Sequence, residues 1–320
     1  MQFRISCMVQ TSKFFYLLAL IFISLISTSQ DKTQVLLKQY EDSLSLMMGK
    51  IYKDGSTLEI ETANQNFLNT FQRTLKVKES FDYPFDSLKH LGKIKSEDKR
   101  LRVFTWNVPQ ADGTQKYFGY ILYKEKKSGS FSVFELQDNR KLITDPINDI
   151  LSPKKWMGAL YYSIVEKKDK RNQYYILLGL DFNDLFSSKK IIEVLSFGKD
   201  TQPVFGARIF KVGETALNRV VFEYSSRASM TLRYIPEAST IVFDHLSPSK
   251  PEYNQNYQFY GPDFTYDGFM FEKGTWVYVR NLDMRNPKRG PVILRESPKK
   301  EPDPGFLYKG KGGIPTLKNK

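Results

Sequence analysis

The sequence predicts a mainly β protein, α+β by content, in which a large antiparallel meander, sandwich or curled sheet packs against an N-terminal helical pair. Three observations predict it. Apolar residues recur every three or four positions before residue 76, short apolar runs separated by turn residues follow from residue 101, and the links between these runs are too short for parallel crossovers. A tandem repeat of fixed period is missing, which weakens a propeller but leaves sandwich and barrel open.

The first 29 residues have the three-part pattern of a secretory signal peptide. Arg4 and Lys13 are the only charged residues among the first 13, residues 14–26 are almost entirely apolar, and a small polar stretch ends at Ser29. This apolar run is shorter than the roughly 20 residues that a helix needs to cross a bilayer. We therefore expect cleavage after Ser29 and an exported, soluble protein, periplasmic or extracellular, with no stable membrane span. An uncleaved segment would instead anchor the chain.

The cysteine count limits the chemistry of the exported chain. Cys7 is the only cysteine and lies inside the predicted signal. After cleavage the chain would have no disulfide, no thiol nucleophile and no cysteine for a lipid anchor. An ordinary hydrophobic core must then stabilise it, and 24 Phe, 19 Tyr and 3 Trp are available to build one.

Two helices are predicted within residues 33–75, the helical part of a single globular domain that spans residues 30–285. Apolar side chains at helical spacing mark the first helix: Leu36, Tyr40, Leu44, Met47, Met48 and Ile51. A second set marks the next helix: Ile60, Ala63, Phe67, Phe71 and Leu75. Ser56 and Glu59 are spaced as a capping box at the start of that helix.

The β-rich part of the domain is predicted over residues 100–281. Runs of strand length, most of them bounded by turn residues, cover 101–108, 117–123, 131–136, 156–166, 173–181, 191–197, 204–210, 219–225, 230–235, 240–245, 268–271 and 276–280. Met230, Leu232 and Tyr234 alternate with polar residues, so one face of that strand can be buried.

Residues 286–320 predict a flexible basic tail. They hold six prolines, five glycines and few large apolar side chains. Between Arg285 and Lys320 there are ten basic residues and three acidic ones. This excess supplies about half of the net charge of +13 of the whole chain. An acidic partner would suit this tail, through contacts that salt weakens. Nucleic acid is not expected as a target of an exported chain.

Several segments resemble an uncharacterised family of exported, β-rich bacterial proteins. They are FDYPFDSL at 81–88, residues 102–106, WMGALYY at 156–162, YYILLGLD at 174–181, PVFGA at 203–207 and FYGPDFTYD at 259–267. The similarity covers nearly the whole body of the chain. That family has no known activity, so the resemblance implies a compartment and no mechanism.

The candidates for catalysis are acidic and imidazole side chains: Glu223, Asp244, His245, Asp263 and Asp267. A histidine beside carboxylates can act as a general base. Adjacent residues on a strand point to opposite faces, however, so Asp244 and His245 are not expected to orient each other. Asp263 and Asp267 flank turn residues, where Asp commonly caps its own backbone. Because no recognised catalytic spacing occurs, we assign no catalytic residue and keep a carboxylate-dependent envelope hydrolase as the alternative.

No metal or cofactor site is predicted. Asp181, Asn183 and Asp184 form an oxygen-rich turn without the glycine and distant glutamate of a calcium loop. A zinc site would have only His90 and His245 besides carboxylates. Phosphate-binding and dinucleotide-binding glycine motifs and the serine hydrolase elbow are also missing.

Binding makes fewer demands on the sequence than catalysis does. The segment from Ser247 to Phe264 carries aromatic side chains that could contact a protein or glycan of the envelope: Tyr253, Tyr257, Phe259 and Tyr260. The competing interpretation is that these rings cover the edge of the core. The sequence therefore favours a non-enzymatic binding or structural protein of the bacterial envelope.

Overall fold

The computed structural model describes residues 32–53, 55–126, 128–169, 172–198 and 200–284. The predicted signal peptide and the predicted basic tail lie outside these described residues. The chain divides into two compact units, Met1–Lys89 and His90–Lys320. The helical segment falls in the first unit and the β-rich segment in the second, and each unit is described by itself.

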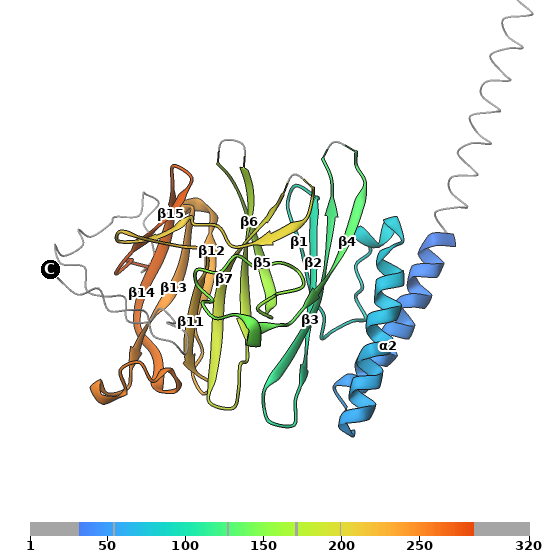
Figure 1. Ribbon diagram of the computed structural model, residues 1–320, viewed down its shortest axis with the longest axis horizontal. Coiled ribbons are helices and arrows are strands. Elements are labelled where there is room, and N and C mark those ends of the chain that lie inside the picture. Colours follow the sequence, from blue (N-terminus) through green and yellow to red (C-terminus); the bar gives the residue numbers. More distant parts are fainter. Residues whose placement is uncertain (1–31, 54, 127, 170–171, 199, 285–320) are drawn as a thin grey trace, which may run out of the picture. The chain divides into compact units, whose positions relative to one another are not determined.

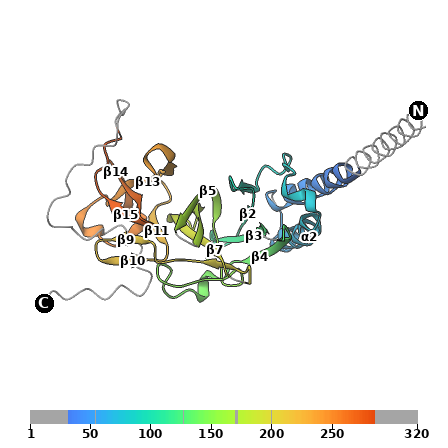
Figure 2. The ribbon, with the colours of Figure 1, turned by 90° about the horizontal axis from the view of Figure 1, so that it is seen from above.

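In the described part of the first unit, two α-helices lie side by side (Figures 1 and 2). Residues 32–51 are helical, and α2 covers Thr57–Leu75. The predicted capping box is confirmed: the Ser56 hydroxyl accepts the backbone N–H of Glu59, and the Glu59 carboxylate accepts the backbone N–H of Ser56. These bonds satisfy backbone groups at the start of α2 that have no partner within the helix. A 3-10 turn, η1 (Lys78–Phe81), follows α2.

The buried stripe of the first helix is shifted at its start from the predicted one. Leu44, Met48 and Ile51 are buried as expected, but Leu36 is 40% exposed and Leu37 is buried in its place. At 3.6 residues per turn, the stripe through Leu44 runs back through position 41. That position holds Glu41. Because Glu is polar, the sequence does not show this position as part of an apolar stripe. Glu41 is tolerated there because its carboxylate accepts the Tyr83 hydroxyl and the Ser87 N–H.

Within the described residues of the second unit, the strands form three sheets. The first sheet has the order β1 (Gly92–Lys95), β2 (Leu101–Pro109), β3 (Gln115–Lys124) and β4 (Phe131–Gln137). The second has the order β11 (Val220–Ser225), β7 (Ser187–Phe197), β6 (Asn172–Asp181) and β5 (Leu160–Asp169), with β8 (Pro203–Phe205) beside β7. The third has the order β10 (Thr215–Leu217), β9 (Phe210–Val212), β15 (Thr275–Val279), β14 (Tyr260–Glu272), β13 (Thr240–Pro248) and β12 (Leu232–Ile235).

The pairing confirms the predicted mainly β, antiparallel class. Neighbouring strands in the first and second sheets are antiparallel, as short links require. The third sheet contains one parallel pair, in which Trp276 of β15 lies opposite Phe210 of β9. Parallel pairing is feasible there because more than 60 residues separate the two strands along the chain.

One continuous hydrophobic core joins the three sheets. Between the first and second sheets, the rings of Tyr123 and Phe197 stack with centroids 3.5 Å apart. Between the second and third, the centroids of Phe222 and Phe243 are 4.5 Å apart. Such aromatic contacts bury a large apolar area per residue, so the sheets form packed layers.

Several predicted strand bounds in this unit need correction; β7, for example, begins at Ser187 and not at Ile191. The runs predicted over 156–166 and 204–210 were drawn too long: β5 begins at Leu160, and the second run splits into β8 and β9. The split occurs at Gly206, whose φ of 104° lies outside extended backbone. The run predicted over 268–271 is too short, because β14 begins at Tyr260. The short strands β1 and β10 were missed.

Candidate functional site

An irregularity between β13 and β14 brings several predicted site residues together. Asp244 lies opposite Tyr266, but Leu246 lies opposite Pro262. His245 alone therefore faces the three residues 263–265 of β14, which form a bulge. Bulges redirect side chains and often occur beside functional sites.

The imidazole of His245 contacts a buried carboxylate. Its Nδ1 lies 2.7 Å from Oδ2 of Asp267, whose side chain is 0% exposed. The Tyr278 hydroxyl donates to the same oxygen at 2.6 Å, and the backbone N–H of Asn281 donates to Oδ1 at 3.0 Å. Because an ionised carboxylate only accepts hydrogen bonds, the tautomer that fits this contact has its proton on Nδ1. Asp267 therefore sets the orientation of the imidazole.

Asp263 lies on the other side of the same imidazole. Its Oδ2 is 3.9 Å from Nε2 of His245 and accepts the Ser247 hydroxyl at 3.0 Å. Its Oδ1 accepts the backbone N–H of Thr265 at 3.0 Å and the Thr265 hydroxyl at 2.7 Å. The prediction that such a residue caps its own backbone is confirmed for Asp263, and the cap shapes the bulge. It is wrong for Asp267, which lies within β14 and binds the distant His245, Tyr278 and Asn281.

The bulge presents a phenyl ring to solvent. Phe264 is 94% exposed, and its backbone has a φ of 68°. A bulky residue in the left-handed region is a conformational outlier, and such strain is concentrated at functional positions. We call the group formed by His245, Ser247, Asp263 and Phe264 the bulge surface.

The carboxyl group of Asp263 favours its charged form. Burial raises its pKa, but the hydrogen bonds from Thr265, the nearby His245 and the Ser247 hydroxyl outweigh this effect, so the pKa of Asp263 is lowered. At neutral pH this side chain is an acceptor of hydrogen bonds and not a general acid.

The remaining catalytic candidates belong to other networks. Asp244 is the neighbour of His245 but accepts the backbone N–H of Thr231 at 2.7 Å. Glu223 lies on β11 of the second sheet, where its carboxylate accepts the Ser187 hydroxyl at 2.6 Å and lies 3.7 Å from Nζ of Lys189. The structure therefore joins His245, Asp263 and Asp267 and gives Asp244 and Glu223 different partners.

The four aromatic candidates divide into two pairs. Tyr260 is 2% exposed, and its hydroxyl donates to Asn254 and accepts the backbone N–H of Gln255. Tyr257 is half-buried against the core, 5.1 Å from the Tyr260 ring. Tyr260 is thus part of the core edge, and Tyr257 packs against the core with part of its side chain exposed.

The second pair reaches the surface. Tyr253 and Phe259 stack with centroids 4.2 Å apart, and Phe259 is 38% exposed. They lie in the short 3-10 turns η4 (Pro251–Tyr253) and η5 (Tyr257–Phe259), which link β13 to β14. Of the predicted binding residues, these two remain available for contact.

The oxygen-rich turn between β6 and β7 uses its side chains to hold the backbone. Asp181 accepts the backbone N–H of Asn183 and pairs with Arg140 at 2.9 Å. Asp184 accepts the backbone N–H of Phe186 and of Ser187. Among the described residues, no group of three or more His, Cys, Asp or Glu side chains is arranged to hold a metal ion.

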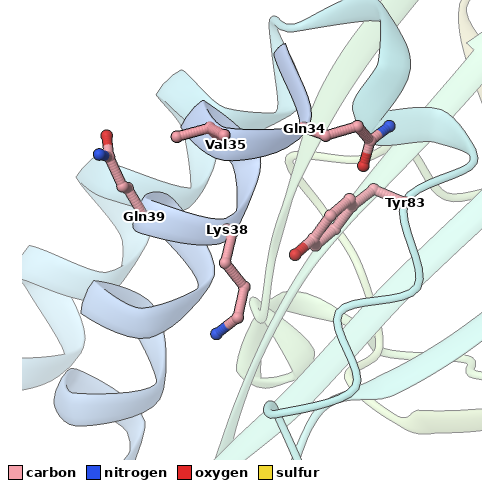
Figure 3. Close-up of a pocket in the computed structure, with 5 residues that line it drawn as sticks. All are labelled: Gln34, Val35, Lys38, Gln39 and Tyr83. Atoms are coloured by element: carbon pink, nitrogen blue, oxygen red, sulfur yellow. The ribbon is translucent and has the colours of Figure 1, made fainter. Parts of the chain in front are cut away.

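Two surface hollows are lined by residues outside the bulge surface. Figure 3 shows the one in the first unit, about 440 Å³, lined by Gln34, Val35, Lys38, Gln39 and Tyr83. Burial and the hydrogen bond to Glu41 raise the pKa of Tyr83, so its hydroxyl serves as a neutral structural donor. The other, about 360 Å³, lies in the second unit beside Arg100, which donates to Gln173 at 3.1 Å.

Phe264, Ser247 and Tyr278 were not selected from the sequence. A signal for the bulge was present: Asp followed two residues later by Thr is a pattern that caps a turn. Nothing in the local sequence indicated that the phenyl ring between them would be exposed, because an isolated Phe is usually a core residue.

Comparisons with known proteins leave the site to be interpreted from its geometry. No protein-family model, curated protein or solved structure matches the chain. None of the helices in the described residues has the length and apolar character needed to span a membrane.

Proposed function

We propose that this protein is an exported, non-enzymatic binding protein of the bacterial envelope that contacts its ligand through the bulge surface. The observation that carries the proposal is the nearly complete exposure of Phe264 at a positive φ. Exposing a phenyl ring and straining its backbone both cost stability, so a role in contact would explain why the ring is there. Asp263, the residue before it on the same bulge, and its neighbours Ser247 and His245 supply polar groups that can fix a ligand's orientation.

Binding is tested by sedimentation with envelope material. The purified chain is incubated with the envelope fraction of a Gram-negative bacterium, and the pelleted share is measured. Phe264→Ala should reduce the pelleted share at least about fivefold, since the exposed ring supplies most of the contact area. Phe186→Ala is the matched control, because Phe186 is also an exposed phenyl side chain but lies in the β6–β7 turn. Equal pelleting of Phe264→Ala and the parent chain would contradict the proposal.

The envelope location rests on residues 1–29 and is tested separately. A tagged full chain should appear outside the cytoplasm, and its N-terminal sequence should begin at Gln30. Removing residues 1–29 should retain the chain in the cytoplasm. An N-terminus that still begins at Met1 in the exported material would instead support a retained anchor.

A carboxylate-dependent hydrolase is the second candidate, and the contact between His245 and Asp267 favours it. A histidine oriented by a buried carboxylate is the arrangement used by general bases. The lowered pKa of Asp263 argues against this residue as the general acid that would complement His245. If the parent chain releases reducing ends or peptides from envelope material and His245→Asn does not, the enzymatic function is correct.

A further inference from the structure

The bulge surface combines a flat apolar ring with acceptors and donors of hydrogen bonds. Phe264 offers both faces of its ring, since it is 94% exposed. Asp263 precedes it in the chain, has a side chain that is 35% exposed, and accepts hydrogen bonds from Ser247 and Thr265. Ligands that match this combination have an apolar face bordered by hydroxyl groups. A pyranose ring has this form, because its C–H groups gather on one face and its hydroxyls lie around the rim.

The bulge surface by itself offers too little apolar area for a stable protein interface. Between residues 240 and 284, the exposed large apolar side chains are Phe259 and Phe264. A phenyl side chain supplies about 200 Å². A stable protein interface needs about 800 Å² on each partner, with a closed rim around its central anchors. One ring bordered by polar side chains suits a single sugar ring better.

The negative charge of Asp263 favours some classes of saccharide over others. Asp263 is anionic at neutral pH, as an ordinary aspartate is, and its hydrogen bonds lower its pKa further. An anionic carboxylate accepts hydroxyl donors strongly and repels carboxylate or sulfate groups on a ligand. Acidic glycans are therefore disfavoured, and neutral ones are favoured.

We propose that the bulge surface binds a neutral saccharide, with one pyranose ring stacked on Phe264 and a hydroxyl of that sugar donating to Asp263. This inference rests on the proposed binding function and adds the class of ligand. His245, held by Asp267, is a further polar group at the rim of the site.

Calorimetric titration with defined oligosaccharides tests the inference. The neutral probes are cellotetraose, maltotetraose, mannotetraose and the tetramer of N-acetylglucosamine, and the acidic probe is tetragalacturonate. At least one neutral probe should bind, and tetragalacturonate should bind at least about tenfold more weakly. Failure of all four neutral probes at millimolar concentration would overturn the inference, as would preference for the acidic probe.

Variants then locate the contact. Phe264→Ala should weaken binding of the best probe at least about tenfold, whereas Phe264→Trp should retain it. Asp263→Asn should weaken binding and also reduce the discrimination against tetragalacturonate. Phe186→Ala should bind as the parent does. Unchanged affinity in both Phe264→Ala and Asp263→Asn would place the sugar elsewhere and overturn the assignment.

The failure of this inference can be distinguished from failure of the proposed function. If no saccharide binds but pelleting with the envelope fraction still depends on Phe264, the binding function stands and the ligand class is wrong. Loss of that pelleting after protease treatment of the envelope fraction would identify a protein partner. If neither saccharide nor envelope material depends on Phe264, both proposals fail.

Discussion

At the scale of single residues, Phe264 combines exposure with backbone strain. A φ of 68° costs a residue with a Cβ atom about 1–2 kcal/mol, and glycine avoids this cost. The surrounding hydrogen bonds from Thr265 to Asp263 hold the conformation in place. Strain of this kind can be measured apart from binding, because alanine and glycine both remove the ring but only glycine relieves the backbone.

Phe264→Gly should therefore be more stable than Phe264→Ala by about 0.5–1 kcal/mol, the strain relieved less the greater entropy of unfolded glycine. Urea unfolding of the two variants measures the difference. At Phe186, where φ is not positive, the order should reverse. If glycine is the less stable variant at both positions, the strain at Phe264 is not real.

At the scale of elements, a buried ion pair fastens β7 to β11 and to the segment before β5. Arg219 and Glu193 are both 0% exposed, with Nε and Oε2 2.7 Å apart. Arg219 also donates to the backbone carbonyls of Pro146, Asp149 and Phe205. A guanidinium can satisfy these acceptors together because its donors form a rigid planar fork.

Arg219→Met should lower the free energy of unfolding by about 3–5 kcal/mol, because it leaves the Glu193 charge buried without its partner. Urea unfolding measures the loss. The double variant Arg219→Met with Glu193→Met should regain part of it, since no buried charge remains. Arg227→Met, at an exposed position, should stay within about 0.5 kcal/mol of the parent chain. A double variant less stable than Arg219→Met alone would contradict this account.

The strands differ in how closely the sequence predicts their bounds. The bounds of β2, β3 and β6 are close to those of long apolar runs such as residues 101–108. In these runs both the spacing of the apolar residues and the length of the run are typical of a strand. β1 and β10 were missed because three or four residues carry too little pattern. The sequence predicts a loop for the first half of β14, since its Gly, Pro and Asp residues signal a turn and the bulge interrupts the alternation.

At the scale of the second unit as a whole, a carboxylate connects two sheets. Asp98 lies between β1 and β2 of the first sheet and accepts hydrogen bonds from Gln173 at 2.7 Å and from the Tyr175 hydroxyl at 2.9 Å, both on β6 of the second. Burial raises the pKa of Asp98, but hydrogen bonds from Ser96, Tyr175, Gln173 and Arg100 outweigh it and the pKa is lowered. The contact therefore makes the packing of the sheets sensitive to acid.

The sign of this dependence follows from the lowered pKa. The folded chain holds Asp98 ionised at a pH where the unfolded chain protonates it, so the stabilisation is present above the ordinary value of 3.8 and is lost as pH falls below it. Asp98→Asn should lower the free energy of unfolding at pH 7 by about 1–2 kcal/mol. The difference from the parent chain should shrink below pH 3.8.

Urea unfolding from about pH 2.5 to about pH 7 measures both effects, because this range extends below and above the ordinary pKa of Asp. Glu97→Gln is the neighbouring control and should stay within about 0.5 kcal/mol of the parent at pH 7, because Glu97 is exposed. A difference for Asp98→Asn that grows as the pH falls would show that the hydrogen bonds do not favour the ionised form.

The sequence by itself determined the class of this protein, the positions of its long strands and the cap of α2, because period, turn residues and capping pairs act within a few neighbouring positions. Only the tertiary structure decided that Glu41 lies on a buried stripe, that Tyr260 belongs to the core and that His245, Asp263 and Asp267 meet while Asp244 and Glu223 do not. Those outcomes depend on strand register and on partners 13 to 46 positions away, as between Thr231 and Asp244 or Glu41 and Ser87. Pairing over such distances is set by packing across the whole unit, because a shift of one residue in register turns every side chain of a strand to the other face.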